Sequence, residues 1–276
     1  MVVVGKGGVG KSTVTALLCR LLARRGEAVV AVDADEQMNL GAALGFASEE
    51  LAKVTPLALD AGYVEEKTGA RPGEGAGAML RLNPDVADVV ERLALPGPDG
   101  VRLLVMGSVQ RAGGGCLCPE NSLLAATVRS MRLRRHEVVV MDTHAGVEHF
   151  GRAVARGFDQ AVVMVDPTFN GVQVGARTAR LAADLGITSL HLVVNRVRRA
   201  GDLERALDYL GRADAAGALD FSSVRELPYD EKALDGEPSV AGLLGESALG
   251  DAVGRLAHDL VAGLAADRDG DASCAP

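Results

Sequence analysis

The chain opens with a glycine-rich stretch whose spacing restricts the possible folds more than any other feature of the sequence. Residues 5–12 read Gly-Lys-Gly-Gly-Val-Gly-Lys-Ser and satisfy the pattern Gly-x4-Gly-Lys-Ser. An apolar strand candidate, Val2–Val4, precedes them, and a segment of helical periodicity, Lys11–Arg25, follows. This order is typical of a phosphate-binding loop, because backbone N–H groups of residues without side chains can surround phosphate oxygens at a helix N-terminus.

The rest of the chain alternates short apolar runs with longer segments of helical period, a pattern of βα units and a mostly parallel sheet. Besides Val2–Val4, the expected strands are Ala28–Asp33, Val101–Met106, Glu137–Asp142, Ala161–Val165, Leu190–Val194 and Val224–Leu227. The expected helices are Lys11–Arg25, Glu120–Arg134, Val172–Leu185, Leu203–Leu210 and Ala248–Leu264. The sequence therefore predicts a three-layer α/β fold of the P-loop NTPase type, in which helices flank a sheet of about seven strands.

No linker separates two complete patterns, so we predict a single domain over residues 1–266. Within it, the stretch from about residue 55 to residue 100 is rich in Gly and Pro and has no clear strand pattern, which indicates an irregular excursion at one edge. The polar residues 267–276 are expected to form a disordered tail.

Composition argues against several classes of protein. Hydrophobic residues make up 48% of the chain, enough for a sizeable core, and the net charge of −8 disfavours binding to a nucleic-acid backbone. No apolar run approaches the ~18 residues of a membrane span. Four cysteines do not form the disulfide framework of a small secreted domain, and they fit a reducing compartment. We therefore predict a cytoplasmic protein with no nucleic-acid or membrane partner.

The loop and a second strand end together predict a site for a nucleotide with Mg²⁺. Lys11 is expected to neutralise the β- and γ-phosphates, and the Ser12 hydroxyl to bind Mg²⁺. Asp142 ends a buried strand and is expected to hold Mg²⁺ through water. The nucleotide-binding residues of the loop are Gly5, Lys6, Gly7, Gly8, Val9, Gly10, Lys11, Ser12 and Thr13.

The choice of base rests on Asn195, which follows a predicted strand. A guanine site of the GTPase type has Asn-Lys with an Asp shortly after, whereas Arg-Val-Arg follows Asn195. This favours ATP over GTP. Asn195 can hydrogen-bond the edge of adenine, and the alternative is an Asn that caps a helix.

Two thiols lie two positions apart on a glycine-rich turn before a predicted helix, at Cys116 and Cys118. A helix N-terminus lowers the pKa of a thiol, which favours metal binding or oxidation. Two ligands are half a site, because structural zinc usually takes four, and soft thiolates also suit nickel or iron–sulfur centres. Simple packing, or a redox pair, is the alternative.

The phosphate-binding loop contains an additional lysine, Lys6. With this lysine the loop resembles the deviant phosphate-binding loop of the dimerising MinD, ParA and nitrogenase-iron-protein ATPases. The resemblance implies a homodimer in which Lys6 reaches the nucleotide of the facing subunit. It also implies that Asp35, after the second strand, positions the attacking water or the metal shell, so that Lys6, Lys11 and Asp35 are catalytic. Asp33 either shares this role or holds the loop. Residues 227–230, Leu-Pro-Tyr-Asp, resemble the adenine-contacting loop, which assigns Pro228 and Asp230 to the nucleotide site.

Two longer segments carry a more specific resemblance. Residues 113–121, Gly-Gly-Gly-Cys-Leu-Cys-Pro-Glu-Asn, and 142–152, Asp-Thr-His-Ala-Gly-Val-Glu-His-Phe-Gly-Arg, resemble the CooC family, the accessory ATPases of carbon monoxide dehydrogenase. This implies an ATP-hydrolysing homodimer that handles nickel for a carbon monoxide dehydrogenase metal centre. Cys116 and Cys118 would then bind Ni²⁺ or Zn²⁺, with one pair from each subunit. The chain departs from the family at His144, where an acid is usual, and at Glu36-Gln37.

Two other functions share the same loop. One is an iron–sulfur reductase resembling nitrogenase iron protein, which holds a cluster with one Cys from each of two loops per chain; Cys-x-Cys on a single loop fits a bridging metal better. The other is a positioning ATPase of the MinD or ParA kind. Its membrane-binding form needs a basic amphipathic helix, and residues 251–264 carry a single Arg.

Overall fold

The computed structural model describes residues 1–35, 37–71, 81, 83–107, 118–132, 137–144, 157–215, 217–245 and 247–272. At positions 118–121, 131–132 and 264–272 it describes the backbone alone.

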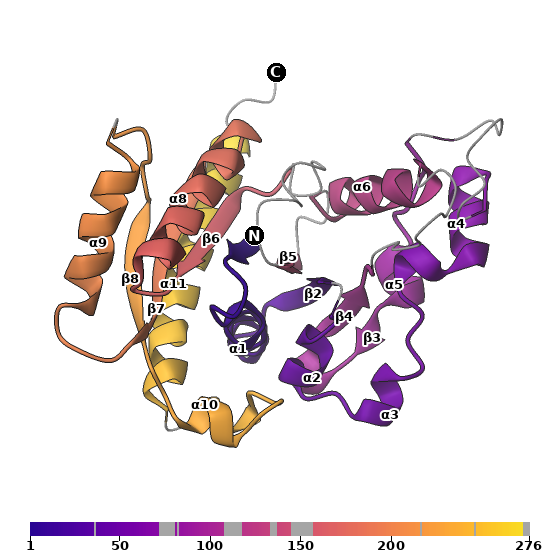
Figure 1. The fold of residues 1–276 in the computed structure, drawn as a ribbon. Helices are drawn as coiled ribbons and strands as arrows, with labels where there is room; N and C mark the ends of the chain where they lie inside the picture. Colours follow the sequence, from indigo (N-terminus) through magenta and orange to yellow (C-terminus); the bar gives the residue numbers. More distant parts are fainter. Residues whose placement is uncertain are drawn as a thin grey trace.

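An eight-stranded sheet forms the centre of the molecule, in the order β3-β4-β2-β5-β1-β6-β7-β8 (Figure 1). The strands are β1 (Val2–Gly5), β2 (Ala28–Ala34), β3 (Leu95–Pro96), β4 (Arg102–Val105), β5 (Glu137–Thr143), β6 (Gln160–Val165), β7 (Ser189–Val197) and β8 (Ser223–Pro228). Among the strands of the described residues, only β3, two residues long, pairs antiparallel; the other pairs are parallel. All seven predicted strands are present, and β3 is an additional edge strand.

Helices cover both faces of the sheet, so the predicted three-layer fold is confirmed. One face carries α1 (Lys11–Arg24), α2 (Leu40–Leu44) and α11 (Ala248–Ala272), and the other carries α4 (Ala61–Thr68), α5 (Val89–Leu93), α6 (Cys118–Arg132), α8 (Phe169–Asp184) and α9 (Asp202–Ala213). In Figure 1, α6 lies above β2 and β4, whereas α1 and α2 lie below them. Within β1, Val3 packs toward α1, and Val2 and Val4 pack toward the opposite layer, which explains the continuous apolar run of this strand.

Short elements complete the connections between these layers: α3 (Ser48–Leu51), α10 (Lys232–Asp235), η1 (Leu57–Leu59), η2 (Pro98–Gly100) and η3 (Ala241–Leu243). Among the described helices, none is both long and apolar enough to cross a bilayer.

The segment from residue 55 to residue 100 is more regular than its composition predicted. It contains η1, α4, α5 and β3, and its most Gly- and Pro-rich part, residues 72–80, lies outside the described residues. The helices there are too short for a helical period to be recognised, and tertiary contacts support them. Tyr63 of α4 is buried beneath the cationic groups of Lys67 and Arg92, and its hydroxyl donates to Asp88.

Helix α11 also differs from its prediction at its C-terminal end. We expected an end near Leu264, and the helical backbone continues to Ala272, through residues 267–272 of the predicted tail. Residues 273–276 lie outside the described part of the chain.

Candidate functional site

The loop between β1 and α1 depends on glycine at two positions where another residue would not fit. Gly10, immediately before α1, has a φ of 94°, and a Cβ there would lie 2.7 Å from Nδ2 of Asn195. A Cβ on Gly5 would lie 2.3 Å from the carbonyl oxygen of Met164 on β6. Met164 lies on β6 and Asn195 on β7, so the loop packs against these two strands. The N-terminus of α1 faces the cavity described below.

The two lysines of the loop have different surroundings. Lys11 is buried, and its Nζ donates to the carbonyl oxygen of Lys6 at 3.3 Å. Burial lowers the pKa of Lys11, while the carboxylates of Asp142 and Asp35 act in the opposite direction. Lys6 is more exposed, and its Nζ lies 3.6 Å from Oδ2 of Asp166, which follows β6. Of the two lysines, Lys11 lines the cavity described below, and Lys6 does not.

Asp142 lies on β5 beside β1 and β2, opposite Val3 and Asp33 in the strand register. Its side chain is fully buried, and neither carboxylate oxygen makes a hydrogen bond among the described residues. Burial raises the pKa of Asp142 to about 6, although the Ser12 hydroxyl and the Lys11 ammonium lower it. A buried carboxylate without a hydrogen-bond donor fits the Mg²⁺ site expected beside Ser12, because a cation would supply the missing partner.

Asp33 holds the loop that follows β2. Its Oδ1 accepts from the backbone N–H of Asp35 at 3.1 Å, and its Oδ2 accepts from that of Leu40 at 3.0 Å, so one buried carboxylate joins both ends of the loop. Burial raises the pKa of Asp33 to about 7, and the nearby charge of Asp142 acts in the same direction. Of the two roles considered for Asp33, these contacts support the loop-holding one.

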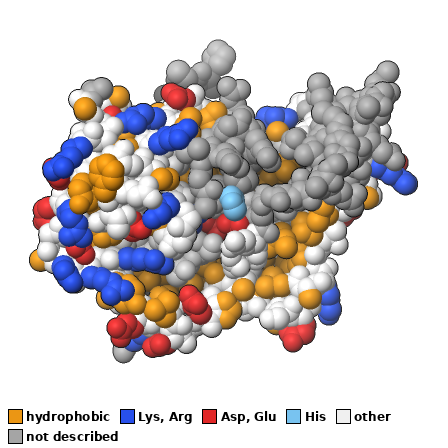
Figure 2. Space-filling view, in the orientation of Figure 1, with side chains coloured by type: hydrophobic (Ala, Val, Ile, Leu, Met, Phe, Trp, Pro, Cys, Tyr) orange, Lys and Arg blue, Asp and Glu red, His pale blue; other side chains and the backbone are white. Residues whose placement is uncertain are grey.

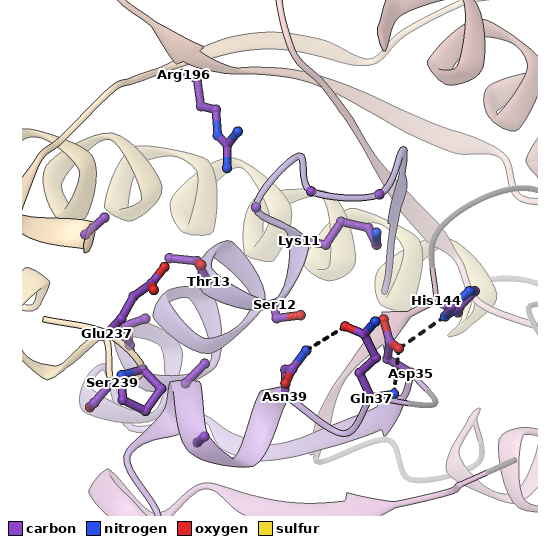
Figure 3. Close-up of a pocket in the computed structure, with 18 residues that line it drawn as sticks. Lys11, Ser12, Thr13, Asp35, Gln37, Asn39, His144, Arg196, Glu237 and Ser239 are labelled. Carbon is purple, nitrogen blue, oxygen red and sulfur yellow. Dashed lines mark hydrogen bonds and ion pairs between the residues drawn. The ribbon is translucent and has the colours of Figure 1, made fainter. Parts of the chain in front are cut away.

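Asp35 points toward the nucleotide loop from the opposite wall (Figure 3). Its Oδ1 accepts from the backbone N–H of Gln37 at 2.9 Å and lies 3.2 Å from Nδ1 of His144. His144 follows β5 directly, so this contact joins the chain after β2 to the chain after β5.

A cavity of about 470 Å³ lies between these groups. It is lined by Gly7, Gly8, Gly10, Lys11, Ser12, Thr13, Asp35, Gln37, Asn39, Ala42, Ala43, His144, Arg196, Ala233, Glu237, Pro238, Ser239 and Val240. Figure 3 shows Glu237 and Ser239 on the side of α1 away from Asp35 and His144. The wall formed by Arg196, Ala233 and residues 237–240 was not predicted; Arg196 lies next to Asn195, and no motif marks the remaining residues.

The three residues predicted to contact adenine do not themselves line this cavity. Asn195 is buried, and its Nδ2 donates to the carbonyl oxygen of Val9 at 2.8 Å, so it supports the phosphate loop from β7. Pro228 ends β8. Asp230 accepts from the Ser247 hydroxyl at 2.9 Å and from the backbone N–H of Lys232 at 3.0 Å. Their contact with adenine stays a prediction.

The two cysteines of the predicted thiol pair lie where a segment outside the described residues meets α6. Cys116 lies outside the described residues, and Cys118 is described only as the backbone of the first residue of α6. In the part of the chain that is described, no group of three or more His, Cys, Asp or Glu side chains is placed to hold a metal. The Cys-x-Cys metal site therefore stays a prediction.

Comparisons with known proteins agree with this geometry. The family model for the CobQ/CobB/MinD/ParA nucleotide binding domain matches residues 1–235. The carbon monoxide dehydrogenase accessory protein CooC of Rhodospirillum rubrum is 38% identical over 221 residues, 80% of this chain and 83% of that protein. The chain belongs to the CooC family, within the MinD/ParA class of nucleotide-binding proteins. An uncharacterised ATP-binding protein of Methanocaldococcus jannaschii is 37% identical over 235 residues, 85% of this chain and 87% of that protein.

A solved structure supports the fold of this CooC-family chain independently. MinD of Pyrococcus horikoshii in complex with Mg-ADP has a TM-score of 0.64 at 21% identity, and the match covers 94% of each chain. This likeness confirms the predicted three-layer fold. The family model and the CooC relative confirm the predicted family and the assignment as a P-loop ATPase.

Proposed function

We propose that this CooC-family ATPase is a cytoplasmic, homodimeric maturation factor that binds and hydrolyses ATP and handles nickel for a carbon monoxide dehydrogenase. The observation that carries the proposal is the 38% identity to a carbon monoxide dehydrogenase accessory protein over 83% of its length. The nucleotide site supports it, because a maturation factor driven by ATP needs a complete phosphate site.

The residues of the site divide the work of ATP hydrolysis. Lys11 and the N–H groups of the loop bind the phosphates, and Ser12 and Asp142, the latter through water, would hold Mg²⁺. When bound, Mg²⁺ would supply positive charge that offsets the charge of the phosphates. Asp35 orients the attacking water, and Lys6 contributes its charge to the nucleotide of the facing subunit. Catalysis then depends on position and charge, as is general for phosphoryl transfer.

The nickel step is assigned to Cys116 and Cys118. One pair from each subunit supplies four thiolate ligands on the two-fold axis of a dimer. Thiolates bind both Ni²⁺ and Zn²⁺, and zinc competes for such sites. The metal found on the purified protein therefore depends on which metal is available. In the proposed function this metal is cargo for the client enzyme.

The test is anaerobic metal analysis with an ultraviolet–visible spectrum and a dimer mass, made on the wild type and on the double variant Cys116→Ser, Cys118→Ser. We expect about one Ni²⁺ or Zn²⁺ per wild-type dimer and none in the double variant. ATP binding should survive in that variant, whereas Lys11→Ala should lose it. Cys274→Ser removes a thiol near the C-terminus and is the matched control.

Undiminished metal in the double Cys variant would refute the thiol assignment. Four irons per dimer with labile sulfide would support the reductase instead. A wild type without metal under all loading conditions would refute the nickel step and leave a nucleotide switch of unknown client.

A further inference from the structure

His144 and Asp35 meet at the wall of the nucleotide cavity, although 109 positions separate them in the sequence. His144 directly follows β5, two residues after Asp142, and Asp35 directly follows β2. The parallel pairing of β2 with β5 places Ala34 opposite Thr143, so the next residue of each strand emerges at the same edge of the sheet. Their proximity is therefore fixed by strand register.

The chemistry of the two groups fixes the direction of their hydrogen bond. An ionised carboxylate can only accept, so Nδ1 of His144 must be the donor across the 3.2 Å to Oδ1 of Asp35. A neutral imidazole does this in its Nδ1–H tautomer, and the contact therefore does not require a charged histidine.

Three contacts restrict Asp35. Its backbone N–H donates to the buried carboxylate of Asp33 at 3.1 Å, which fixes the main chain. Its Oδ1 accepts from the backbone N–H of Gln37 at 2.9 Å as well as facing His144. Among the described residues, no hydrogen bond reaches its other oxygen, Oδ2. One oxygen thus has two donors, and the second stays available to a group in the cavity.

We infer that His144 is a positioning residue for ATP hydrolysis, in which its Nδ1–H holds Asp35 by Oδ1 so that Oδ2 can accept a hydrogen bond from the attacking water. His144 itself touches neither the water nor the nucleotide in this role. The inference rests on the proposed role of Asp35. Two residues at the end of β5 would then have different roles. Asp142 would hold the metal, and His144 would orient the carboxylate of Asp35.

A pair of substitutions of similar size separates this role from simple packing. Asn places an amide nitrogen near the position of Nδ1 and keeps a donor. Leu is close to histidine in volume and has no donor. We expect His144→Leu to lower kcat at least roughly tenfold, with KM and the Kd of a non-hydrolysable ATP analogue unchanged within about twofold. His144→Asn should recover kcat to within roughly threefold of the wild type.

Two further variants make the result specific. His258→Leu removes an exposed histidine from α11 and should hydrolyse ATP at the wild-type rate. Asp35→Asn should be slow by itself, and adding His144→Leu to it should cause little further loss, because the two residues act through one contact. If His144→Leu does not fold, His144→Ala replaces it in the same comparison with His144→Asn.

Two results would overturn the inference while leaving the role of Asp35 intact. One is a normal kcat in His144→Leu beside a slow Asp35→Asn. The other is an equal loss in the Leu and Asn variants, which would indicate packing. A normal kcat in Asp35→Asn would instead refute the proposed role of Asp35 itself.

Discussion

At the scale of single residues, the site concentrates negative charge that the protein alone does not neutralise. Asp33 and Asp142 are paired in the strand register, both are buried, and the pKa of each is raised, to about 7 and about 6. Asp33 has two backbone donors, whereas Asp142 has no hydrogen bond among the described residues. The difference supports the loop-holding role of Asp33 and the proposed Mg²⁺ role of Asp142.

The raised pKa of Asp142 gives a prediction about pH. Its folded value of about 6 exceeds 3.8, so the folded protein binds more protons than the unfolded chain between these values. The stability from this group is therefore complete below about pH 4 and is lost as the pH rises through about 6. We expect Asp142→Asn, without nucleotide, to flatten this pH dependence and to raise Tm at pH 8 by roughly 2–4 °C.

The same variant should lose the stabilisation that Mg²⁺ with ATP gives the wild type. Thermal unfolding at pH 5 and pH 8, with and without Mg-ATP, measures both effects. Asp184→Asn, an exposed carboxylate at the end of α8, is the control and should behave as the wild type. Full Mg-dependent stabilisation in Asp142→Asn would contradict the metal role.

At the scale of elements, the sequence predicted what local pattern determines. Most of the strands were found because they are short apolar runs, and the β1–loop–α1 unit was found because its glycines have a fixed spacing. The helices α4 and α5 were missed because they are short and depend on contacts such as those around Tyr63. The cavity wall at Ala233 and residues 237–240 was missed because tertiary packing brings it beside α1, more than 200 positions away in the sequence.

Asn195 illustrates a residue whose importance was predicted and whose contact was not. A polar residue at a strand end indicated the site, but only the structure shows that its amide donates to the carbonyl oxygen of Val9. Asp at this position has the same shape and cannot donate, and its charge would face a carbonyl oxygen.

We therefore expect Asn195→Asp to weaken ATP and GTP by the same factor, at least roughly tenfold, because the phosphate loop serves both nucleotides. Titration with non-hydrolysable analogues of each measures this. A loss confined to ATP would show that contact with adenine dominates instead. Asp208→Asn, on the exposed face of α9, is a control that should leave both affinities unchanged.

At the scale of the whole molecule, the parallel sheet brings the ends of β1, β2, β5 and β6 to one edge. The two lysines of the phosphate-binding loop lie at this edge and differ in burial: Lys11 is buried and Lys6 is half-buried. Over the half of the molecule that carries α8 and α9, Figure 2 shows Lys and Arg side chains interspersed with Asp and Glu. The ammonium of Lys6 contacts Asp166, which follows β6. A pair of this kind contributes about 0–1 kcal/mol, so a phosphate group can replace Asp166 as the partner of Lys6 at little cost.

This weak pairing makes Lys6 the residue by which the proposed dimer is best tested. We expect Lys6→Gln to change the free energy of unfolding by less than about 0.5 kcal/mol, and to bind nucleotide, because Lys11 and the loop N–H groups remain. Dimerisation with a non-hydrolysable ATP analogue should be lost, and hydrolysis with it, since the facing subunit no longer receives the lysine. Sedimentation with and without the analogue measures the association, and Lys53→Gln, an exposed lysine after α3, is the matched control. A Lys6→Gln protein that dimerises like the wild type would mean that Lys6 serves its own subunit, and the contact with Asp166 would then be its working geometry.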